Sequence, residues 1–535
     1  MEAHCSHIAY KDTGYFSKIT IDYLNNATQL QPFFQHQPTL QGILNAIQER
    51  KNFATNRNVL VSELTKQYEG ITLTDIQKNN LQLLLQENTF TITTAHQPNI
   101  FTGPLYFIYK ILHVIKLAEE CNKHFADYQF VPVYYMGSED ADLDELGFVN
   151  VGGEKLVWQT NQSGAVGRMK IDKNLLTLIN NIQGQIGIHS FGNEFSTLLK
   201  TCYTEDKTIQ QATLEFVNIL FNQFGLIIII ADTTAFKKTF EKIIVKELQE
   251  SFSNKALQKT VTALEKYYKV QAGGRDINLF YLQENGRDRI EKENDVFTIK
   301  KADGSYQNID IGKELKDNIQ AFSPNVILRG VFQETILPNV AFVGGGGELA
   351  YWLELKDVFN AAQVPYPALF LRNSFLLIDE KIQTLLNKLS INTEQLFQKE
   401  NLLVNEMIKT TLSNSVIKQS NEATQQIHNA YTTLKNNIQL LYPSLAQHTE
   451  ALQTKALHKL KELDKKIIRA EKRKQTELVR QIATLKQQLF PKESLQERTD
   501  NIAMYYAKYG ADIIHILYQY SLTTEQQFTV LSIKS

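Results

Sequence analysis

The sequence predicts an α/β protein whose core is a parallel sheet, interrupted by inserted segments and followed by a long antiparallel helical hairpin. Runs of β-forming residues pass into polar turns and then into helical spacing, as in residues 89–120. The same order of strand, loop and helix recurs in residues 341–358. From about Asp379 the apolar residues instead repeat in steps of three and four, which is the spacing of a coiled coil.

Residues 89–120 form the clearest unit of the core. Thr89 to Thr94 is rich in β-branched residues and predicts a strand, and Leu105 to Leu117 carries apolar residues at helical spacing. Thr102 is predicted to cap this helix and Pro104 to lie in its first turn. The N–H groups at the start of the helix would then face the carboxyl end of the strand, where open α/β sheets bind ligands.

Further strands are predicted where short apolar runs lie between polar turns. The helix after the first strand favours a parallel, right-handed crossover to the second. Insertions into the core are expected around residues 150–320, where turn sequences such as Ala-Asp-Gly-Ser at 302–305 occur. The predicted strands are 129–136, 225–232, 341–343 and 368–371, with inserted β-hairpins at 278–290 and 295–309.

The helical hairpin is predicted from two apolar seams. The first runs from Ile427 to Leu441 in steps of 4, 3, 4 and 3 residues. The second runs from Ala456 to Leu489 and contains an interval at 470–478 that resembles a four-residue stutter. Tyr442-Pro443 separates the seams and Pro491 ends the second, so two antiparallel helices are expected.

Length and apolar content are sufficient for several compact parts, since the chain has 535 residues of which 43% are hydrophobic. Residues 496–535 regain globular composition, with a possible closing strand near Phe528, so the chain is expected to return to the core after the hairpin. The predicted organisation is a helical region at 1–88 packed on the core, a catalytic core at 89–380, the hairpin at 381–495 and the returning segment at 496–535.

Composition limits the partners and the compartment. The chain has 56 Lys and Arg against 57 Asp and Glu, so its net charge of -1 favours no nucleic-acid partner, and the basic run 465–474 is interpreted as a solvated helix face. Three scattered cysteines are too few for a disulfide framework, which fits a reducing cytoplasm. The apolar run Leu226 to Ile230 is far shorter than the ~20 residues of a membrane span. A cytoplasmic protein without membrane contact is therefore expected.

Four polar segments meet at the carboxyl edge of the sheet if its strands are parallel. They are the His96 and Gln97 loop, the acidic loop 139–145, the glycine loop 344–347 and Arg372. A loop histidine is more often a structural hydrogen-bonding group than a catalyst, and an acidic run is more often a solvated loop. Their positions directly after predicted strands favour a ligand site, so both interpretations stay open.

Each segment suits a particular ligand chemistry. The acids suit a substrate ammonium group or a metal ion, and zinc is not expected because no His or Cys stands beside them. The glycines allow backbone amides to approach an anion closely; the alternative is a tight turn, which needs only one or two glycines. Arg372 suits a carboxylate or a phosphate. GGGGE matches neither the phosphate-binding GxxxxGK[ST] loop nor the GxGxxG dinucleotide pattern, so it does not name its ligand.

Several motifs occur in a fixed order from about residue 90 to the C-terminus: TAHQPNIFTGPLYFIYK, VPVYYMGSEDADLDEL, LPNVAFVGGGGELAYWLELK, LRNSF and QERTDNIAMYYAKYG. Together they resemble the bacillithiol-biosynthesis family of cysteine-adding enzymes, the cysteine ligases. The resemblance implies a Rossmann-like core related to class I aminoacyl-tRNA synthetases and a coiled-coil hairpin used in homodimerisation. It also implies the activity, which is the joining of cysteine to glucosaminyl-malate through an amide bond.

The implied reaction sets the expected roles. A carboxylate forms an amide in water only after activation, as an acyl-phosphate or adenylate, so ATP with Mg²⁺ is the suspected cofactor, and no metal site made by the protein itself is expected. His96 is a candidate to accept the proton of the attacking amine. The candidate catalytic residues are His96, Gln97 and Asp140, and the candidate substrate-binding residues are Thr102, Gly103, Glu139, Asp142, Asp144, Gly344, Gly345, Gly346, Gly347, Glu348, Arg372 and Asn373.

Two positions depart from the commoner family form, which has Gln in place of His96 and His in place of Ala141. Either the general base has moved between the two loops or neither residue is a base. Two other functions also stay open: a different ATP-dependent amino-acid-activating or nucleotidyl-transfer enzyme on the same fold, and a non-catalytic coiled-coil scaffold. The polar, glycine-rich strand ends argue against the scaffold.

Overall fold

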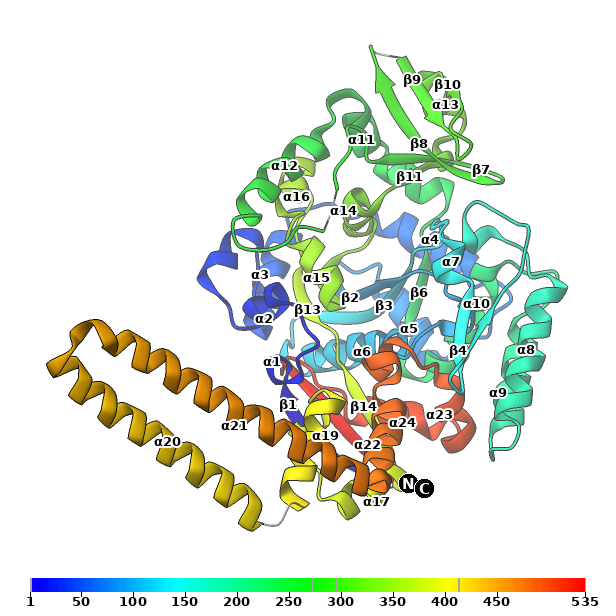
Figure 1. Ribbon diagram of the computed structural model, residues 1–535. Coiled ribbons are helices and arrows are strands. Elements are labelled where there is room, and N and C mark those ends of the chain that lie inside the picture. Colours follow the sequence, from blue (N-terminus) through cyan, green and yellow to red (C-terminus); the bar gives the residue numbers. More distant parts are fainter. Residues whose placement is uncertain (1, 272, 295, 412–413, 535) are drawn as a thin grey trace. The chain divides into compact units, whose positions relative to one another are not determined.

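The structure is a computed structural model that describes residues 2–271, 273–294, 296–411 and 414–534. The chain divides into two compact units, labelled by element in Figure 1. The first unit comprises Met1–Leu377 and Leu495–Ser535, and the second comprises Ile378–Ser494. Asp295, at the start of the second predicted hairpin, lies outside the described residues.

A five-stranded parallel sheet forms the centre of the first unit. Its order is β13-β12-β2-β3-β6, and every neighbouring pair is parallel. β3 and β6 follow β2 on one side, and β12 and β13 follow on the other, which is the strand order of a Rossmann-like sheet with its switch point between β2 and β12. The strands are β2 (Thr89–His96), β3 (Gln129–Met136), β6 (Ile227–Ile230), β12 (Asn339–Gly344) and β13 (Ala368–Leu371).

These strands form because they can be buried on both faces. All eight residues of β2 except Ala95 are buried, and the four residues of β6 are all isoleucine and all buried. The predicted strands are confirmed with small changes of boundary: β2 continues to His96, and β6 is shorter than the range 225–232. The predicted parallel α/β core is confirmed as well.

Helices α3 (Leu40–Arg50) and α6 (Tyr106–His124) pack against this sheet in one apolar cluster with Phe90 and Ile92. Their apolar residues lie at helical spacing, so each helix buries one continuous face. The other helices before the insertions are α1 (Tyr10–Thr13), α2 (Lys18–Leu24), α4 (Arg57–Gln67) and α5 (Asp75–Leu83). The remaining core helices are α14 (Val326–Ile336), α15 (Gly346–Trp352) and α16 (Lys356–Ala362).

The inserted segments form a hairpin, a helical group and a second sheet. The second sheet has the order β10-β9-β8-β7-β11 and is antiparallel throughout, which confirms the predicted hairpins. Its strands are β7 (Leu279–Gln283), β8 (Gly286–Glu293), β9 (Val296–Lys300), β10 (Tyr306–Asn308) and β11 (Phe322–Pro324). The other inserted elements are α7 (Leu143–Leu146), β4 (Phe148–Val151), β5 (Glu154–Val157), α8 (Lys173–Ile186), α9 (Gly192–Cys202), α10 (Ile209–Phe221), α11 (Thr234–Glu250), α12 (Phe252–Leu264) and α13 (Ile311–Asp317).

The N-terminal region differs from the helical prediction at its start. Residues Glu2–Ala9 form strand β1, which pairs antiparallel with β15 (Gln527–Lys534). β15 also neighbours β14 (Phe375–Asp379), so a three-stranded sheet joins segments from both ends of the sequence. β1 contains two His and one Cys, and this weak alternation of polar and apolar residues left no clear strand signal. Helices α23 (Ile502–Tyr509) and α24 (Asp512–Gln519) precede β15.

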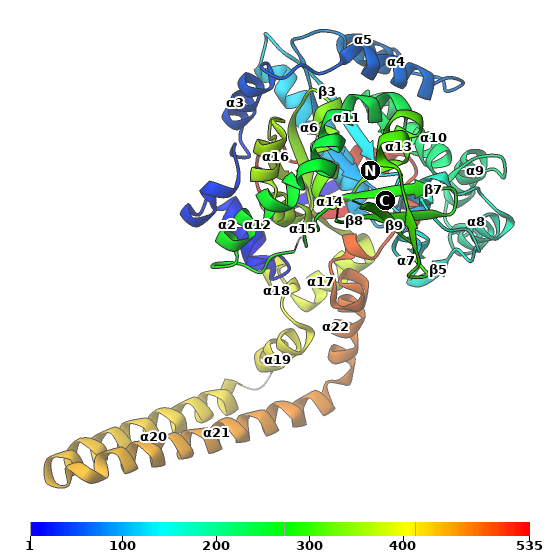
Figure 2. The ribbon, with the colours of Figure 1, turned by 90° about the horizontal axis from the view of Figure 1, so that it is seen from above.

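The second unit contains the predicted antiparallel hairpin. Helices α20 (Asn414–Leu441) and α21 (Ala446–Lys474) run side by side, joined by a turn that begins at Pro443 (Figure 2). Ser420 Oγ donates to Asp464 Oδ1 at 2.6 Å across the pair. The other helices of this unit are α17 (Glu380–Leu389), α18 (Thr393–Leu396), α19 (Glu400–Thr411) and α22 (Thr476–Leu489).

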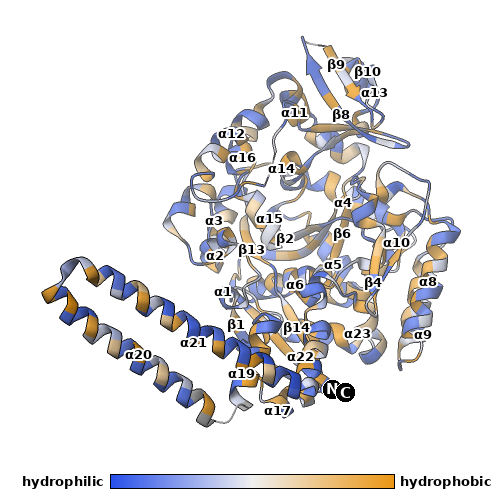
Figure 3. Cartoon of the chain, in the orientation of Figure 1, coloured by the Kyte–Doolittle hydropathy of each residue, from blue (hydrophilic) through white to orange (hydrophobic). Residues whose placement is uncertain are grey.

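One detail of the predicted coiled coil is wrong. The interval 470–478 is a break between α21 and α22 at Gln475, whose φ of -103° and ψ of 46° are not helical, and is not a stutter in one helix. Hydrophilic and hydrophobic residues alternate along α20 and α21 (Figure 3), and Leu434 of the predicted seam is 49% exposed. Among the residues that the structure describes, every helix is too short or too polar to cross a membrane.

Candidate active site

A cleft of about 260 Å³ lies at the carboxyl ends of the central strands, at the switch point of the sheet. β2 delivers His96 to it, and the turn after the neighbouring strand β12 delivers Gly345. The strand ends predicted to converge therefore do so. The cleft is lined by His96, Gln97, Tyr106, Lys110, Glu145, Arg329, Gly345, Gly346, Gly347, Glu348, Tyr351, Arg372 and Arg498.

The loop between β2 and α6 does not have the predicted cap. Helix α6 begins after Leu105, which makes no side-chain cap, whereas Thr102 lies in a short 3-10 turn, Ile100–Thr102. Phe101, Thr102 and Gly103 all have positive φ angles, of 53°, 70° and 60°, so the chain reverses direction before the helix starts. The predictions that Thr102 caps the helix and that Pro104 lies within its first turn are therefore wrong.

Contacts from distant segments hold this unusual loop. Asn501 Nδ2 donates to the carbonyl oxygens of Phe101 and Gly103, at 2.9 and 2.5 Å. A Cβ at position 103 would lie 2.8 Å from Asn99 Cβ, so the loop requires glycine for its conformation and for the close approach. Thr102 Oγ1 is buried without a hydrogen-bond partner among the described residues. Thr102 and Gly103 thus shape the loop and do not line the cleft.

His96 is buried, with its side-chain Nε2 lacking a partner in the described part of the chain. Its ring lies 5.4 Å, between centroids, from the rings of both Tyr106 and Phe107. Burial holds the pKa of His96 well below its usual value, and the positive charges of Lys110, Arg329 and Arg372 lower it further. The imidazole is therefore neutral at pH 7 and surrounded by cations.

Gln97 and Asp140 contact each other at the edge of the cleft. Gln97 Nε2 donates to Asp140 Oδ2 at 3.1 Å, and Arg329 Nη1 lies 3.6 Å from the same oxygen. Burial by itself would raise the pKa of Asp140, but Arg329, Arg287 and the hydrogen bonds outweigh it and hold the pKa below its usual value. Asp140 is therefore an ionised carboxylate that orients Gln97 and Arg329.

Lys110 and Glu348 form an ion pair under the glycine turn. Lys110 is buried in α6 and also donates to the carbonyl of Ala95 at 3.0 Å. Glu348 Oε2 accepts the N–H of Gly345 at 2.8 Å, which caps the start of α15. Burial lowers the pKa of Lys110 while Glu348 opposes that effect. Glu348 is thus occupied by two partners of its own.

Arg372 follows β13 and is almost fully buried. Its Nη2 donates to Glu497 Oε1 at 2.7 Å, and its Nη1 donates to the carbonyl of Asn373 and to Ser374 Oγ. Its guanidinium lies 5.2 Å from the ring centroid of Tyr106. Only Nε of the guanidinium has no partner among the described residues. Arg372 is therefore not free for the bidentate contact that its side chain otherwise favours.

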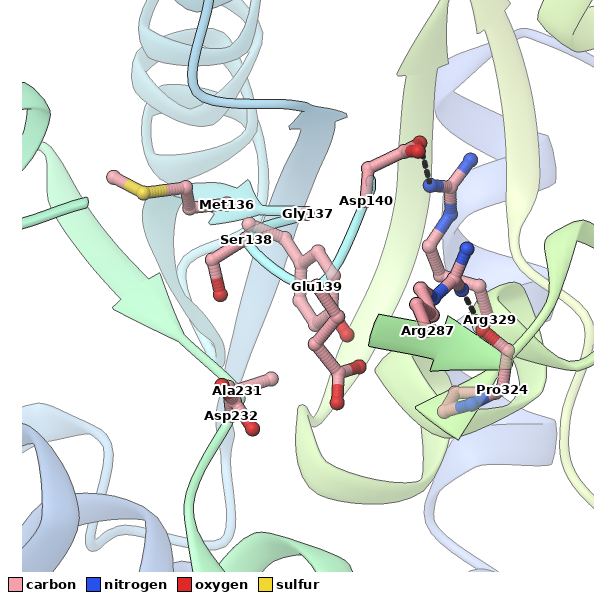
Figure 4. Close-up of a pocket in the computed structure, with 11 residues that line it drawn as sticks. Met136, Gly137, Ser138, Glu139, Asp140, Ala231, Asp232, Arg287, Pro324 and Arg329 are labelled. Atoms are coloured by element: carbon pink, nitrogen blue, oxygen red, sulfur yellow. Dashed lines mark hydrogen bonds and ion pairs between the residues drawn. The ribbon is translucent and has the colours of Figure 1, made fainter. Parts of the chain in front are cut away.

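The acidic loop divides between two surroundings (Figure 4). Asp140 extends toward Arg329, whereas the carboxylate of Glu139 points away from it, toward the side of Asp232. Glu139 pairs with the buried Lys237, which also donates to the carbonyl of Phe322 at 2.7 Å. Burial raises the pKa of Glu139 in spite of this pair. A small cavity of about 10 Å³ lies here, with space for about one water.

Other acids of this loop have structural partners or face solvent. Asp142 Oδ1 accepts the N–H of Glu145 at 3.0 Å and caps α7. Asp144 is exposed and does not line the cleft. Glu145 does line it, and partial burial together with the charges of Asp140 and Asp142 raises its pKa. Within the described residues, no three His, Cys, Asp or Glu side chains gather in a way that would hold a metal ion.

The glycine run and Asn373 have separate roles. Gly344 ends β12, and a Cβ there would lie 2.8 Å from Phe342 Cε1. A Cβ at Gly346 would lie 3.2 Å from Thr20 Oγ1, whereas Gly345 and Gly347 have more space around them. Gly344 is the last residue of β12, Gly345 is the N-cap of α15, and Gly346 and Gly347 lie in its first turn, so the run leads directly from strand to helix and is not a tight turn. Asn373 Nδ2 donates to the carbonyl of Leu522 at 2.9 Å, away from the cleft lining.

Sequence reasoning missed several residues of the cleft and also Glu497, which holds Arg372 from outside the cleft lining. Lys110 interrupts the largely apolar run FIYKILHVI, which is a usable signal for a paired buried lysine. Arg329 lies in α14 and has no comparable signal. Glu497 and Arg498 belong to the QERTDN motif, but they follow no core strand, so spacing alone does not bring them to the sheet edge. Tyr106 and Tyr351 were missed because aromatic residues on helices are usually core residues.

Comparison with known proteins places the whole chain in one group. Residues 1–373 match the family model described as bacillithiol biosynthesis BshC, N-terminal Rossmann-like domain, and residues 375–533 match the C-terminal coiled-coil domain of the same family. A relative from Flavobacterium johnsoniae is 37% identical, with 98% of this chain and 99% of the relative covered. Relatives from Flavobacterium psychrophilum and Christiangramia forsetii are 37% and 34% identical, over 95% and 99% of this chain and 96% and 99% of the relatives. All three are named, as provisional assignments, cysteine ligase BshC.

A solved structure, provisionally described as an arginyl-tRNA synthetase from Campylobacter jejuni, is also similar. Its sequence identity is 11% and its TM-score 0.21, over 85% of this chain and all of that one. A likeness at this level supports no conclusion about function or fold. The family match therefore carries the assignment by itself.

Proposed function

Because this chain belongs to the BshC family of bacillithiol biosynthesis, we propose that it is a cysteine ligase that joins cysteine to glucosaminyl-malate through an amide bond. The single observation that supports this most is that the family match covers both units of the chain. The cleft at the switch point of the Rossmann-like sheet is consistent with it. The cleft combines a neutral imidazole with several cations, which suits a reaction between an amine and an anionic carboxylate.

His96 is the proposed proton acceptor. An amine that attacks a carboxyl carbon must lose a proton, and a neutral imidazole nitrogen without a partner is a suitable acceptor. In the tautomer with its proton on Nδ1, the lone pair lies on the buried, unpartnered Nε2 of His96. Asp140 and Gln97 act beside it, because their mutual hydrogen bond and the contact with Arg329 fix the positions of polar groups at the cleft edge.

The cations of the cleft are the proposed sites for substrate anions. Lys110, Arg329 and Arg498 line the same space as Arg372, and together they outnumber the acids Glu145 and Glu348. Glu348 is already paired with Lys110, so Glu145 is the carboxylate of the cleft lining that has no ion-pair partner among the described residues. We assign the ammonium group of cysteine to Glu145 in place of Glu139, because Glu139 is buried against Lys237. Asp142 and Asp144 act only through the shape and charge of the loop.

ATP is the proposed source of activation energy. The group that ATP supplies when bound is a phosphoryl or adenylyl group, which converts a carboxylate oxygen into a leaving group. The donor set of the cleft suits phosphate oxygens, since Arg329, Arg498 and the first turn of α15 at Gly346 and Gly347 line it. These residues would hold the phosphates, with any Mg²⁺ bound to phosphate oxygens.

The hairpin is the proposed homodimer contact, and the cytoplasm the proposed location. Its tip exposes a cluster of large apolar side chains, with Leu440 83% and Leu441 73% exposed. Tyr442 and Leu445 extend the same apolar cluster. A second copy would remove this apolar area from water. Size-exclusion chromatography with light scattering tests the proposal, and a monomer at micromolar concentration would contradict it.

A mass-spectrometric assay tests the activity. Purified protein is incubated with cysteine and glucosaminyl-malate, with and without ATP and Mg²⁺, and the condensation product is measured. Product that forms only with ATP supports an ATP-dependent ligase. Product without ATP would contradict the proposed energy source, and no product under any condition would contradict the proposed ligase activity. A parallel incubation with other amine acceptors tests whether glucosaminyl-malate is the preferred partner.

A further inference from the structure

The guanidinium of Arg372 is held on every side but one. Its two terminal nitrogens donate to Glu497, to Ser374 and to the carbonyl of Asn373. Its backbone is fixed as well, since the N–H of Arg372 donates to the carbonyl of Gly344 at 2.8 Å. Nε is left buried and without a partner among the described residues. An N–H group left in this state costs free energy that a ligand oxygen would recover.

Glu497 is the residue that fixes this arrangement. Its side chain is fully buried, and its two oxygens accept from Arg372 Nη2 at 2.7 Å, from Ser374 Oγ at 3.2 Å and from the N–H of Phe375 at 3.3 Å. A carboxylate with three donors cannot rotate without breaking charge-assisted bonds. Glu497 therefore determines which nitrogen of Arg372 stays free, although Glu497 itself does not line the cleft.

Gly345 borders the free nitrogen. A Cβ on Gly345 would lie 3.6 Å from Arg372 Nε and 3.4 Å from Glu348 Oε2, and no other atom comes closer. The φ of Gly345 is -73°, which any residue adopts, so this glycine is not needed for its backbone conformation. The absence of a side chain instead leaves space beside Nε that an added Cβ would fill.

We propose that Glu497 is a positioning residue that aims Arg372 Nε at the space beside Gly345, where it donates one hydrogen bond to a carboxylate or phosphoryl oxygen of the substrate. The inference rests on the proposed function only in taking that oxygen to belong to a substrate of the ligase. A single donor binds one oxygen and leaves the others to Lys110, Arg329 and Arg498, which line the same cleft. The contact therefore fixes the orientation of the anion, and the surrounding charges supply most of its affinity.

Titration calorimetry of the full chain with two probes tests this contact. The probes are inorganic phosphate and L-malate, which represent the phosphoryl and carboxylate sources. Gly345→Ala fills the space beside Arg372 Nε and leaves the ion pair of Arg372 with Glu497 in place. Glu497→Gln keeps the size of the side chain but removes the charge that holds Arg372. Both variants are expected to bind at least one probe about tenfold more weakly than the wild type, since one hydrogen bond to a charged group is lost. Arg372→Lys, which lacks Nε, is expected to match them.

A matched control separates this loss from a general effect of adding a methyl group. Gly184→Ala, in α8 and with no atom within 4 Å of its Cβ, is expected to bind both probes like the wild type. The probe that is weakened by Gly345→Ala identifies the source of the oxygen. Failure of the wild type to bind either probe, or full affinity in Gly345→Ala, would overturn the inference.

Kinetics keep this inference separate from the proposed function. If the wild type makes product, Gly345→Ala and Glu497→Gln are expected to raise KM more than they lower kcat, and thermal unfolding shows whether each variant is folded. Unchanged KM in a folded Gly345→Ala would overturn the inference and leave the ligase intact. If the wild type makes no product but the probes bind more weakly to both variants, the anion contact stands and the ligase proposal fails.

Discussion

His113 Nε2 lies 2.8 Å from the carbonyl oxygen of Thr523, and His113 Nδ1 accepts the N–H of Asn373 at 3.2 Å. The second contact requires an unprotonated Nδ1, so the proton is on Nε2 and the imidazole is neutral. Burial is the main reason that the pKa of His113 is lowered to about 4. This residue joins α6, the segment after β13 and the chain before β15 in one neutral hydrogen-bonded group.

Acid is expected to destabilise the first unit through His113. Its folded pKa of about 4 lies below the usual 6.5, so the unfolded chain binds a proton first, and stability is lost as the pH falls from about 6.5 toward 4. The loss from this residue is about 3 kcal/mol. Thermal unfolding at pH 7 and pH 4.5 checks this prediction. His113→Gln is expected to be less stable than the wild type at pH 7 but to lose less stability than the wild type between pH 7 and pH 4.5. The exposed His458→Gln is the control, and an equal acid loss in wild type and His113→Gln would contradict the prediction.

His96→Gln is expected to lower kcat by about 10²- to 10⁴-fold, because it removes the proposed proton acceptor while keeping a polar side chain of similar reach. KM is expected to change little, since the cations that bind the anions remain. Steady-state ligase kinetics check that kcat falls while KM stays nearly unchanged. Equal kcat in wild type and variant would remove His96 from the mechanism, and the remote His4→Gln serves as the control.

The pH profile of the ligase should show that substrate changes the basicity of His96. In the free protein burial and the charges of Lys110, Arg329 and Arg372 hold its pKa well below 6.5, so the acid limb of kcat/KM is expected below pH 6.5. A bound anion neutralises these charges and raises that pKa, so the acid limb of kcat is expected at higher pH. The pH profiles of kcat/KM and of kcat are measured to check that the acid limb of kcat lies at the higher pH. Coincident limbs would show that no anion binds near the imidazole.

Lys110 and Glu348 are expected to be coupled in stability. Lys110→Met leaves Glu348 without its buried cation and is expected to destabilise the protein by about 3 kcal/mol. The double variant Lys110→Met with Glu348→Gln is expected to recover part of this loss, because no carboxylate is then left unpaired. Denaturant unfolding of the four proteins of the cycle measures the coupling. If the losses of stability in the two single variants add exactly in the double variant, the ion pair contributes nothing to the free energy of unfolding.

Gly103→Ala is expected to damage the loop between β2 and α6. The residue has φ of 60°, and an added Cβ would lie 2.8 Å from Asn99 Cβ, so both strain and overlap oppose the change. We expect a loss of about 1–3 kcal/mol and a lower kcat/KM, since the loop carries His96 at its start. Thermal unfolding and ligase kinetics check this against Gly184→Ala. Wild-type values in both measurements would contradict it.

The fold was predictable to a large extent because its signals are local. The isoleucine run of β6 and the alternation of strand and helix identify a parallel sheet, and apolar spacing identifies the hairpin. β1 was missed because its strand is specified by pairing with β15 and not by its own residues. Tertiary contacts determine the secondary structure of such a segment, and a single sequence does not show these contacts.

The site was predictable only where its residues follow core strands. His96, Gln97, Gly345 and Arg372 were found in this way, and all four line the cleft. The Thr102 cap was wrong because three residues with positive φ, held by Asn501, intervene before the helix. Lys110, Arg329 and Arg498 were missed because they reach the cleft from helices and from the returning segment, where spacing carries no information about the sheet edge.

The pairing of β1 with β15 has a consequence for synthesis. Glu2 lies opposite Lys534, so β1 emerges from the ribosome long before its partner exists. At about 5–20 residues per second the strand waits on the order of half a minute or more with an unpaired edge. Its polar residues Glu2, His4 and Ser6 reduce the risk of aggregation during this time. Glu497 and Arg498 are also translated late, so the cleft and its supporting contacts are completed only after almost the whole sequence has been made.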